Sequence, residues 1–143
     1  MTAQVVTTAA APGNVWKSVG AVALGFAVVA VLSLGTDQVF HATGVFPPWG
    51  ERMDSHALFA LALGYRIVYQ ILGSWLTARL APRNPMRHAW ILGGIGFVLS
   101  VLGAVASIQA NLGPNWYPIV LALTALPCAW IGGMLYVRQA ANR

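Results

Sequence analysis

Long apolar stretches separated by polar or helix-breaking residues dominate the hydrophobic pattern of the chain. The first runs from Ser18 to Thr36, 19 residues without a charge, and predicts a helix over about 18–40. The second predicts a helix over about 55–80, interrupted near its middle by Arg66. A helix rises about 1.5 Å per residue, so roughly 20 apolar residues cross the hydrocarbon core of a bilayer. Both stretches are therefore long enough to span a membrane.

The second half of the chain carries no charged residue from Ala89 to Val137. One helix of these 49 residues would be more than about 70 Å long, which is too long for a single crossing. Residues 110–115 include Asn, Gly and Pro, which favour a turn. The pattern thus predicts two further helices over about 87–109 and 116–137. The expected fold is an all-α membrane protein, a bundle of four transmembrane helices.

Composition supports a lipid environment. The 143 residues are 58% hydrophobic and 8% charged, and the mean hydropathy is +0.69. Soluble domains average about 25% charged residues, so too little charge is present to cover a surface in water. The eight Lys and Arg residues lie mostly at the ends of the apolar stretches, whereas a nucleic-acid binder carries them in a dense patch. The expected partner is the lipid bilayer, and no nucleic acid is expected.

Basic residues are distributed unevenly between the two ends of the predicted bundle. One end has Arg52 beside two carboxylates. The other end has Lys17, Arg79, Arg83, Arg87, Arg138 and Arg143. Because basic segments remain on the cytoplasmic side of a membrane, both termini are predicted to be cytoplasmic. The predicted cytoplasmic segments are 1–17 and 138–143, and the predicted external loops are 42–54 and 110–115.

Two weaker patterns concern how the helices pack. Residues 72–76 and 131–135 are similar, and each segment ends three residues before an arginine, so the two halves allow two parallel helical hairpins. Small residues at a spacing of four predict close packing within the bundle or between copies in a homo-oligomer or larger membrane complex. On the third predicted helix these residues are Gly96, Ser100 and Ala104, and Gly103 and Ser107.

Four short segments are similar to those of a known group of proteins. They are TDQVFH at 36–41, FPPWG at 46–50, YRIVY at 65–69 and LPCAW at 126–130. With these segments the chain resembles, over about 18–137, small four-span bacterial membrane proteins to which no activity is attached. The resemblance implies a protein of the bacterial inner membrane and carries over no functional residue.

Charged and polar side chains within the predicted helices are candidate functional groups, because a charge at the bilayer centre costs at least about 2.5–3.5 kcal/mol. Asp37 and His41 are four residues apart and share a helix face near the outer end, where simple solvation is the alternative. Arg66 lies deeper, on a polar face with Tyr69 and Gln70. We expect Arg66 to reach Asp37 and line an outward-facing polar cavity; a purely structural ion pair is the alternative.

Other chemistry has less support in the sequence. A metal site drawn from Asp37, His41 and His56 matches no known ligand spacing, so neither a metal nor another cofactor is predicted. His88, which stands beside a basic residue at the predicted inner interface, is expected to contact lipid headgroups.

These features favour a non-enzymatic membrane module, either a small transport or permeation protein or an accessory subunit of a membrane complex. Short loops leave little room for an active site in water. The alternative is a membrane-embedded enzyme acting on a lipid or quinone-like substrate, which requires Asp37, His41, Arg66 and Tyr69 to converge on one cavity. A purely structural partner of another membrane chain would need no cavity.

Overall fold

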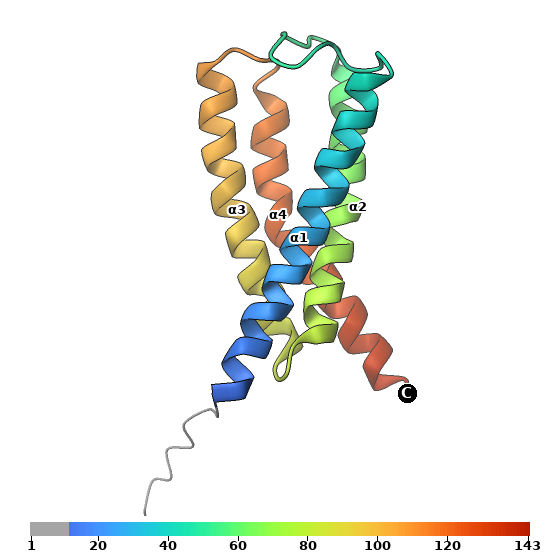
Figure 1. Cartoon of the computed structure of the whole chain (residues 1–143), viewed down its shortest axis with the longest axis vertical. Helices are drawn as coiled ribbons and strands as arrows, with labels where there is room; N and C mark the ends of the chain where they lie inside the picture. The colour runs from blue at the N-terminus through green and yellow to red at the C-terminus, as the bar shows by residue number, and fades with distance from the viewer. Residues whose placement is uncertain (1–11) are drawn as a thin grey trace, which may run out of the picture.

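The computed structural model describes residues 12–143, which form four helices and no strands (Figure 1). The helices are α1 (Pro12–Ala42), α2 (His56–Leu80), α3 (Pro85–Gln109) and α4 (Trp116–Ala141). All four are long and apolar enough to cross a membrane. The prediction of an all-α membrane protein with a four-helix bundle is confirmed.

Two helices continue beyond the predicted spans. α1 has 31 residues and begins at Pro12, inside the segment 1–17 that was expected to precede it. α4 continues to Ala141, beyond the expected end at 137. An apolar window marks only the part of a helix that lies in hydrocarbon, whereas the helix itself extends into the headgroup layer. Residues 1–11 of the expected N-terminal segment lie outside the described residues.

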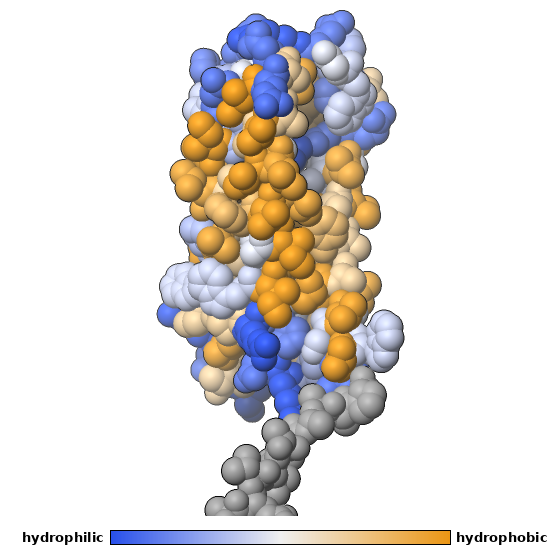
Figure 2. Space-filling model, turned by 90° about the vertical axis from the view of Figure 1, so that its left-hand side faces the viewer, coloured by the Kyte–Doolittle hydropathy of each residue, from blue (hydrophilic) through white to orange (hydrophobic). Residues whose placement is uncertain are grey.

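The surface shows an apolar band between two polar ends (Figure 2). Large hydrophobic side chains are exposed along this band, including Val31, Leu34, Leu102 and Leu123. We call one end the basic end, because it carries Lys17 of α1, four arginines from α2, the α2–α3 turn, α3 and α4, and Arg143 just after α4. The loop end is formed by the connections 43–55 and 110–115. An apolar surface this extensive is stable against lipid and unfavourable in water.

The four helices do not pack equally with one another. α3 packs most extensively on α4, α4 also packs on α2, and α1 packs mainly on α2. α1 approaches α3 over a short length, and within residues 12–143 it makes no close backbone approach to α4. The side of the bundle between α1 and α3 is therefore the least closed.

Glycines allow α1 and α2 to approach closely. A Cβ atom at Gly25 would lie 2.8 Å from the carbonyl oxygen of Gly73, and one at Gly73 would lie 2.9 Å from the carbonyl oxygen of Gly25. One turn along, the Thr77 hydroxyl donates a hydrogen bond to the Ala21 carbonyl oxygen over 3.3 Å. Lipid supplies no hydrophobic force between helices, so close backbone contact and such hydrogen bonds hold them together.

The small residues of α3 do not form the close helix packing that was predicted within the bundle, and their packing between copies stays a prediction. Instead of forming a helix interface, they line a groove between α1 and α3; the residues concerned are Gly96, Ser100, Gly103, Ala104 and Ser107. α3 approaches α4 through Gly93, where an added Cβ would meet the Cβ of Ala129. A seam between helices and the wall of a groove both favour small side chains, so spacing alone did not distinguish them.

Gly25→Ala should lower the free energy of unfolding by about 1–3 kcal/mol, the usual cost of overpacking, because its Cβ would meet the α2 backbone. Gly35→Ala is the matched control, since nothing lies within 4 Å of a Cβ at that position of α1. Unfolding in mixed micelles with increasing dodecyl sulfate measures both. Equal stability of the two variants would contradict the close approach of α1 and α2.

Candidate functional site

Asp37 and Arg66 form an ion pair between α1 and α2. The Nη2 of Arg66 donates to one carboxylate oxygen of Asp37, and the hydroxyl of Tyr65 donates to the other. The Asp37 side chain is 8% exposed, whereas the Arg66 side chain remains 28% exposed. Charges in an apolar environment are tolerated when they are paired and hydrogen-bonded. The expected contact between these two side chains is therefore present, and both oxygens of Asp37 accept hydrogen bonds from α2.

Tyr69 strengthens the same contact between α1 and α2. The Thr36 hydroxyl donates to the Leu32 carbonyl oxygen over 2.7 Å, so the Tyr69 hydroxyl donates to the Thr36 oxygen over 2.9 Å. Tyr65 and Tyr69 are four residues apart on one face of α2, with ring centroids 5.8 Å apart. Tyr69 therefore bonds to α1 and is not among the residues that line the cavities described below.

His41 turns away from Asp37, although the two residues share a helix face in the sequence. Its Nδ1 donates to the carbonyl oxygen of Pro47, and its ring centroid lies 3.9 Å from that of Trp49. Trp49 in turn donates from Nε1 to Gln38 over 3.1 Å. His41 thus anchors the connection 43–55 on the end of α1 and makes no hydrogen bond to the carboxylate.

A groove of about 520 Å³ lies between α1 and α3 and is open to the side of the bundle. Its floor includes Arg66 and Gln70 of α2 and Tyr117 and Leu121 of α4. Its walls are mainly apolar and include Phe26, Ala30, Leu34, Leu92 and Leu99. The volume falls within the range of about 300–1,000 Å³ that is usual for small-molecule sites. We refer to this space as the groove.

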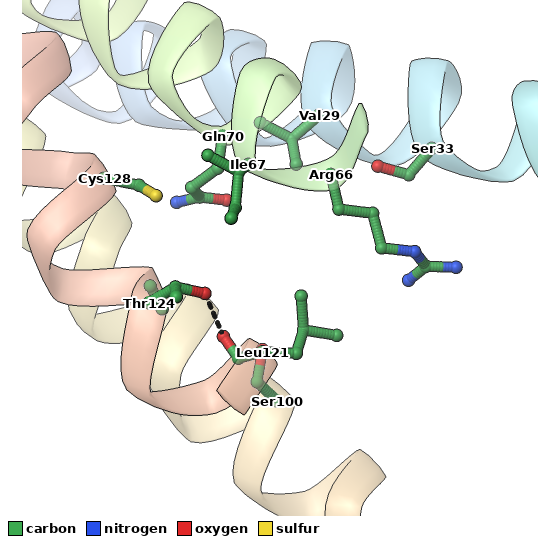
Figure 3. Close-up of a pocket in the computed structure, with 10 residues that line it drawn as sticks. Val29, Ser33, Arg66, Ile67, Gln70, Ser100, Leu121, Thr124 and Cys128 are labelled. Carbon is green, nitrogen blue, oxygen red and sulfur yellow. Dashed lines mark hydrogen bonds between the residues drawn. The ribbon is translucent and has the colours of Figure 1, made fainter. Parts of the chain in front are cut away.

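A smaller cavity of about 110 Å³ adjoins the floor of the groove. Figure 3 shows Arg66 and Gln70 extending from α2 into the space faced by Thr124 of α4. Three buried polar atoms of the described chain have no hydrogen-bond partner, namely Arg66 Nε, Gln70 Nε2 and Ser74 Oγ. Their residues are four apart and therefore occupy one face of α2. This face presents unpaired polar groups to the interior of the bundle.

The third cavity is a vestibule of about 260 Å³ beneath the connection 43–55. Its lining includes Asp37, His41, Glu51, Arg66 and Tyr117. Arg66 and Tyr117 also line the groove. A cavity beside the ion pair is thus present at the loop end, although most of its lining is apolar. It shares three residues with the groove, Arg66, Tyr117 and Ser107, and they mark where the two meet.

Two other histidines lie apart from the ion pair. His56 accepts a hydrogen bond from Trp116 Nε1 over 2.8 Å. His88 is 7% exposed and donates to the Asn84 carbonyl oxygen over 3.2 Å, so the expectation that it contacts headgroups is wrong. It lines an apolar groove between α1 and α3 at the basic end. Within residues 12–143, no three His, Cys, Asp or Glu residues lie close enough to hold a metal ion.

Two tyrosines of the site were absent from the prediction. Tyr65 precedes Arg66, and its spacing of four from Tyr69 was the available signal that both face α1. Tyr117 follows Trp116 at the start of α4, a position typical of an aromatic residue at the membrane interface. Its place between the vestibule and the groove depends on how α4 packs on α2, which no local pattern specifies.

Asp37→Leu should lower the free energy of unfolding by about 2–4 kcal/mol, because it leaves the largely buried Arg66 without its carboxylate. Adding Arg66→Met should restore most of this loss, since the pair is then replaced by apolar groups. Asp54→Leu is the control; its pair with Arg52 is exposed and worth about 0–1 kcal/mol. Unfolding in mixed micelles measures all variants, and no recovery in the double variant would argue against the pair.

Comparison of the chain with protein-family models, curated proteins and solved structures gives no match.

Proposed function

We propose that this protein is a non-enzymatic membrane module that binds a small amphipathic molecule in the groove. It would serve as a small transport or permeation protein or as the ligand-holding subunit of a membrane complex. The observation that carries the proposal is the position of Arg66. This paired yet partly exposed charge lies where the vestibule at the loop end meets the groove.

The two cavities adjoin different parts of the molecular surface. The vestibule lies at the loop end, beside the polar connection 43–55. The groove is open at the side of the apolar band, where the exposed wall residues Phe26, Leu34 and Leu99 would face lipid tails. A molecule with a polar head and an apolar tail matches this arrangement, because its head can be hydrogen-bonded at Arg66 while its tail remains in the groove.

Positions of the candidate catalytic groups favour binding over chemistry. The enzymatic alternative required Asp37, His41, Arg66 and Tyr69 to converge on one cavity. Asp37, His41 and Arg66 do line the vestibule together, but Tyr69 bonds to Thr36 and lines none of the cavities described above. The Nδ1 of His41 is bonded to the Pro47 carbonyl oxygen. The Asp37 carboxylate, which is the nearest candidate base, already accepts hydrogen bonds from Tyr65 and Arg66. General acid–base catalysis needs a group within hydrogen-bond reach of the substrate. The Asp37 side chain is only 8% exposed, so little of its carboxylate is open to a substrate.

We further propose that the protein lies in the bacterial inner membrane with its basic end in the cytoplasm. Six of the eight Lys and Arg residues are at that end, and this asymmetry sets the orientation of most helical membrane proteins. The vestibule would then open on the outer side of the membrane.

Cysteine labelling tests the orientation. In a Cys128→Ala background, Glu51→Cys marks the loop end and Ala140→Cys marks the basic end; both positions are exposed. A membrane-impermeant maleimide added to intact cells should label residue 51 and leave residue 140 unlabelled until the cells are lysed. Labelling of residue 140 alone in intact cells would reverse the proposed orientation.

A pair of glycine variants on α3 tests the groove. Gly103→Leu places a side chain in the groove, and Gly94→Leu places one outside its lining; nothing lies within 4 Å of a Cβ at either position. The probe is a ten-carbon alcohol with a diazirine in its chain, and peptide mass spectrometry maps its crosslinks. Gly103→Leu should reduce crosslinks to groove residues by about fivefold or more, because it occupies ligand volume. Equal labelling of both variants would oppose the proposal.

A further inference from the structure

Arg66 is the strongest hydrogen-bond donor in the lining of the groove. A guanidinium has five N–H donors and no acceptor. Arg66 uses Nη2 for Asp37, its Nε has no partner, and 28% of its side chain remains exposed. One turn deeper, the amide of Gln70 also has a nitrogen without a partner. A ligand that supplies acceptor oxygens would hydrogen-bond the exposed part of the guanidinium. The Gln70 nitrogen is buried, and rotation of the amide about its last side-chain bond, a soft torsion, would turn it toward the same oxygens and satisfy a donor that is costly to leave unpaired.

The charges around the groove favour a neutral headgroup. Arg66 is the charged residue in the lining of the groove, and Asp37 already balances it. An anionic headgroup arriving through the vestibule would meet two carboxylates, Asp37 and Glu51, against one guanidinium. A cationic headgroup would meet the guanidinium itself within the groove. Either ion would lose its hydration without finding an opposite charge that is not already paired within the protein. This is unfavourable in an apolar site.

The walls of the groove accommodate an apolar tail of variable length. Phe26 and Leu34 of α1 face Leu99 of α3 across the lateral opening, and each of the three is at least 39% exposed. A tail longer than the groove can therefore continue into the lipid. A fully enclosed pocket would instead limit the length of the ligand.

We infer that the groove binds a neutral amphiphile whose head carries carbonyl-type acceptor oxygens, such as a quinone or another conjugated ketone. Arg66 and the Gln70 amide hold the head, and the walls of α1 and α3 hold the tail. This inference rests on the proposed function and adds the chemical class of the ligand to it.

The test compares three probes that share a ten-carbon tail and differ in headgroup: decylubiquinone, decyl phosphate and decyltrimethylammonium. Native mass spectrometry of the full chain in dodecyl maltoside reports the bound fraction of each. The neutral quinone should bind at least about tenfold more tightly than either charged probe, since only the charged heads lose hydration without a partner.

Two glutamine variants assign the headgroup contact. Gln70→Leu should weaken decylubiquinone binding by about three- to tenfold, the range expected for one hydrogen bond. It breaks no hydrogen bond of the folded chain, because the Gln70 nitrogen has none. Gln139→Leu makes the same change at the basic end, where Gln139 accepts from Trp75 over 3.2 Å, and should leave quinone binding unaltered.

The outcomes separate the ligand class from the proposed function. Equal or tighter binding of a charged probe would overturn the neutral headgroup, and equal quinone binding by the wild type and Gln70→Leu would overturn the assigned contact. If all three probes bind alike and Gly103→Leu abolishes their binding, the groove is a ligand site and the headgroup inference fails. If the wild type binds none of the three probes, both proposals are overturned.

Discussion

Arg66 lies within the apolar length of α2, where an unpaired guanidinium would cost at least about 2.5–3.5 kcal/mol, and its pairing with Asp37 shapes the loop-end half of the bundle. The ion pair fastens α1 to α2 at this level. The contact of Gly25 with Gly73 fastens the same two helices nearer the basic end. Because both attachments are to α2, α1 is held away from α4. The groove is the space left between α1 and the pair formed by α3 and α4.

The ion pair also sets the chemistry of the groove. A buried pair contributes little net stability compared with a well-packed apolar pair, since the desolvation of both charges offsets their attraction. Stability alone therefore does not explain why an ion pair is present in an apolar span. A better explanation is that the pair keeps part of the Arg66 guanidinium exposed to the cavities. Tyr65 binds the second oxygen of Asp37, which leaves the exposed part of the Arg66 guanidinium available to a ligand.

The sequence predicted the architecture well because membrane insertion depends on local properties. Uninterrupted apolar stretches and basic ends identify spans without reference to neighbouring helices. The Asp37–Arg66 contact was predictable for a related reason: few charges lie in the spans, so their partners are few. His41 was harder to place, because its partner Pro47 belongs to an irregular loop whose path depends on tertiary contacts.

The groove itself was beyond sequence reasoning. Gly96 and Gly103 of α3 carry the same spacing as a packing seam, and whether such a stripe meets a helix or lines a cavity depends on where α1 is held. Tyr117 illustrates the same limit, since its interfacial position was readable and its place on the groove floor required the packing of α4 on α2. Local sequence patterns thus predicted the helices and the charged residues within them, whereas the site depends on how the helices pack together.

The most direct test of this account is magic-angle-spinning NMR of the protein in lipid bilayers, with ¹⁵N-arginine and ¹³C-aspartate labels. In an Asp54→Asn variant, Asp37 is the remaining aspartate of the sequence. The account predicts a through-space correlation between an arginine Nη and the Asp37 Cγ at about 4 Å or less, with the carbon shift of an ionised carboxylate. A protonated Asp37 without any arginine correlation would contradict it.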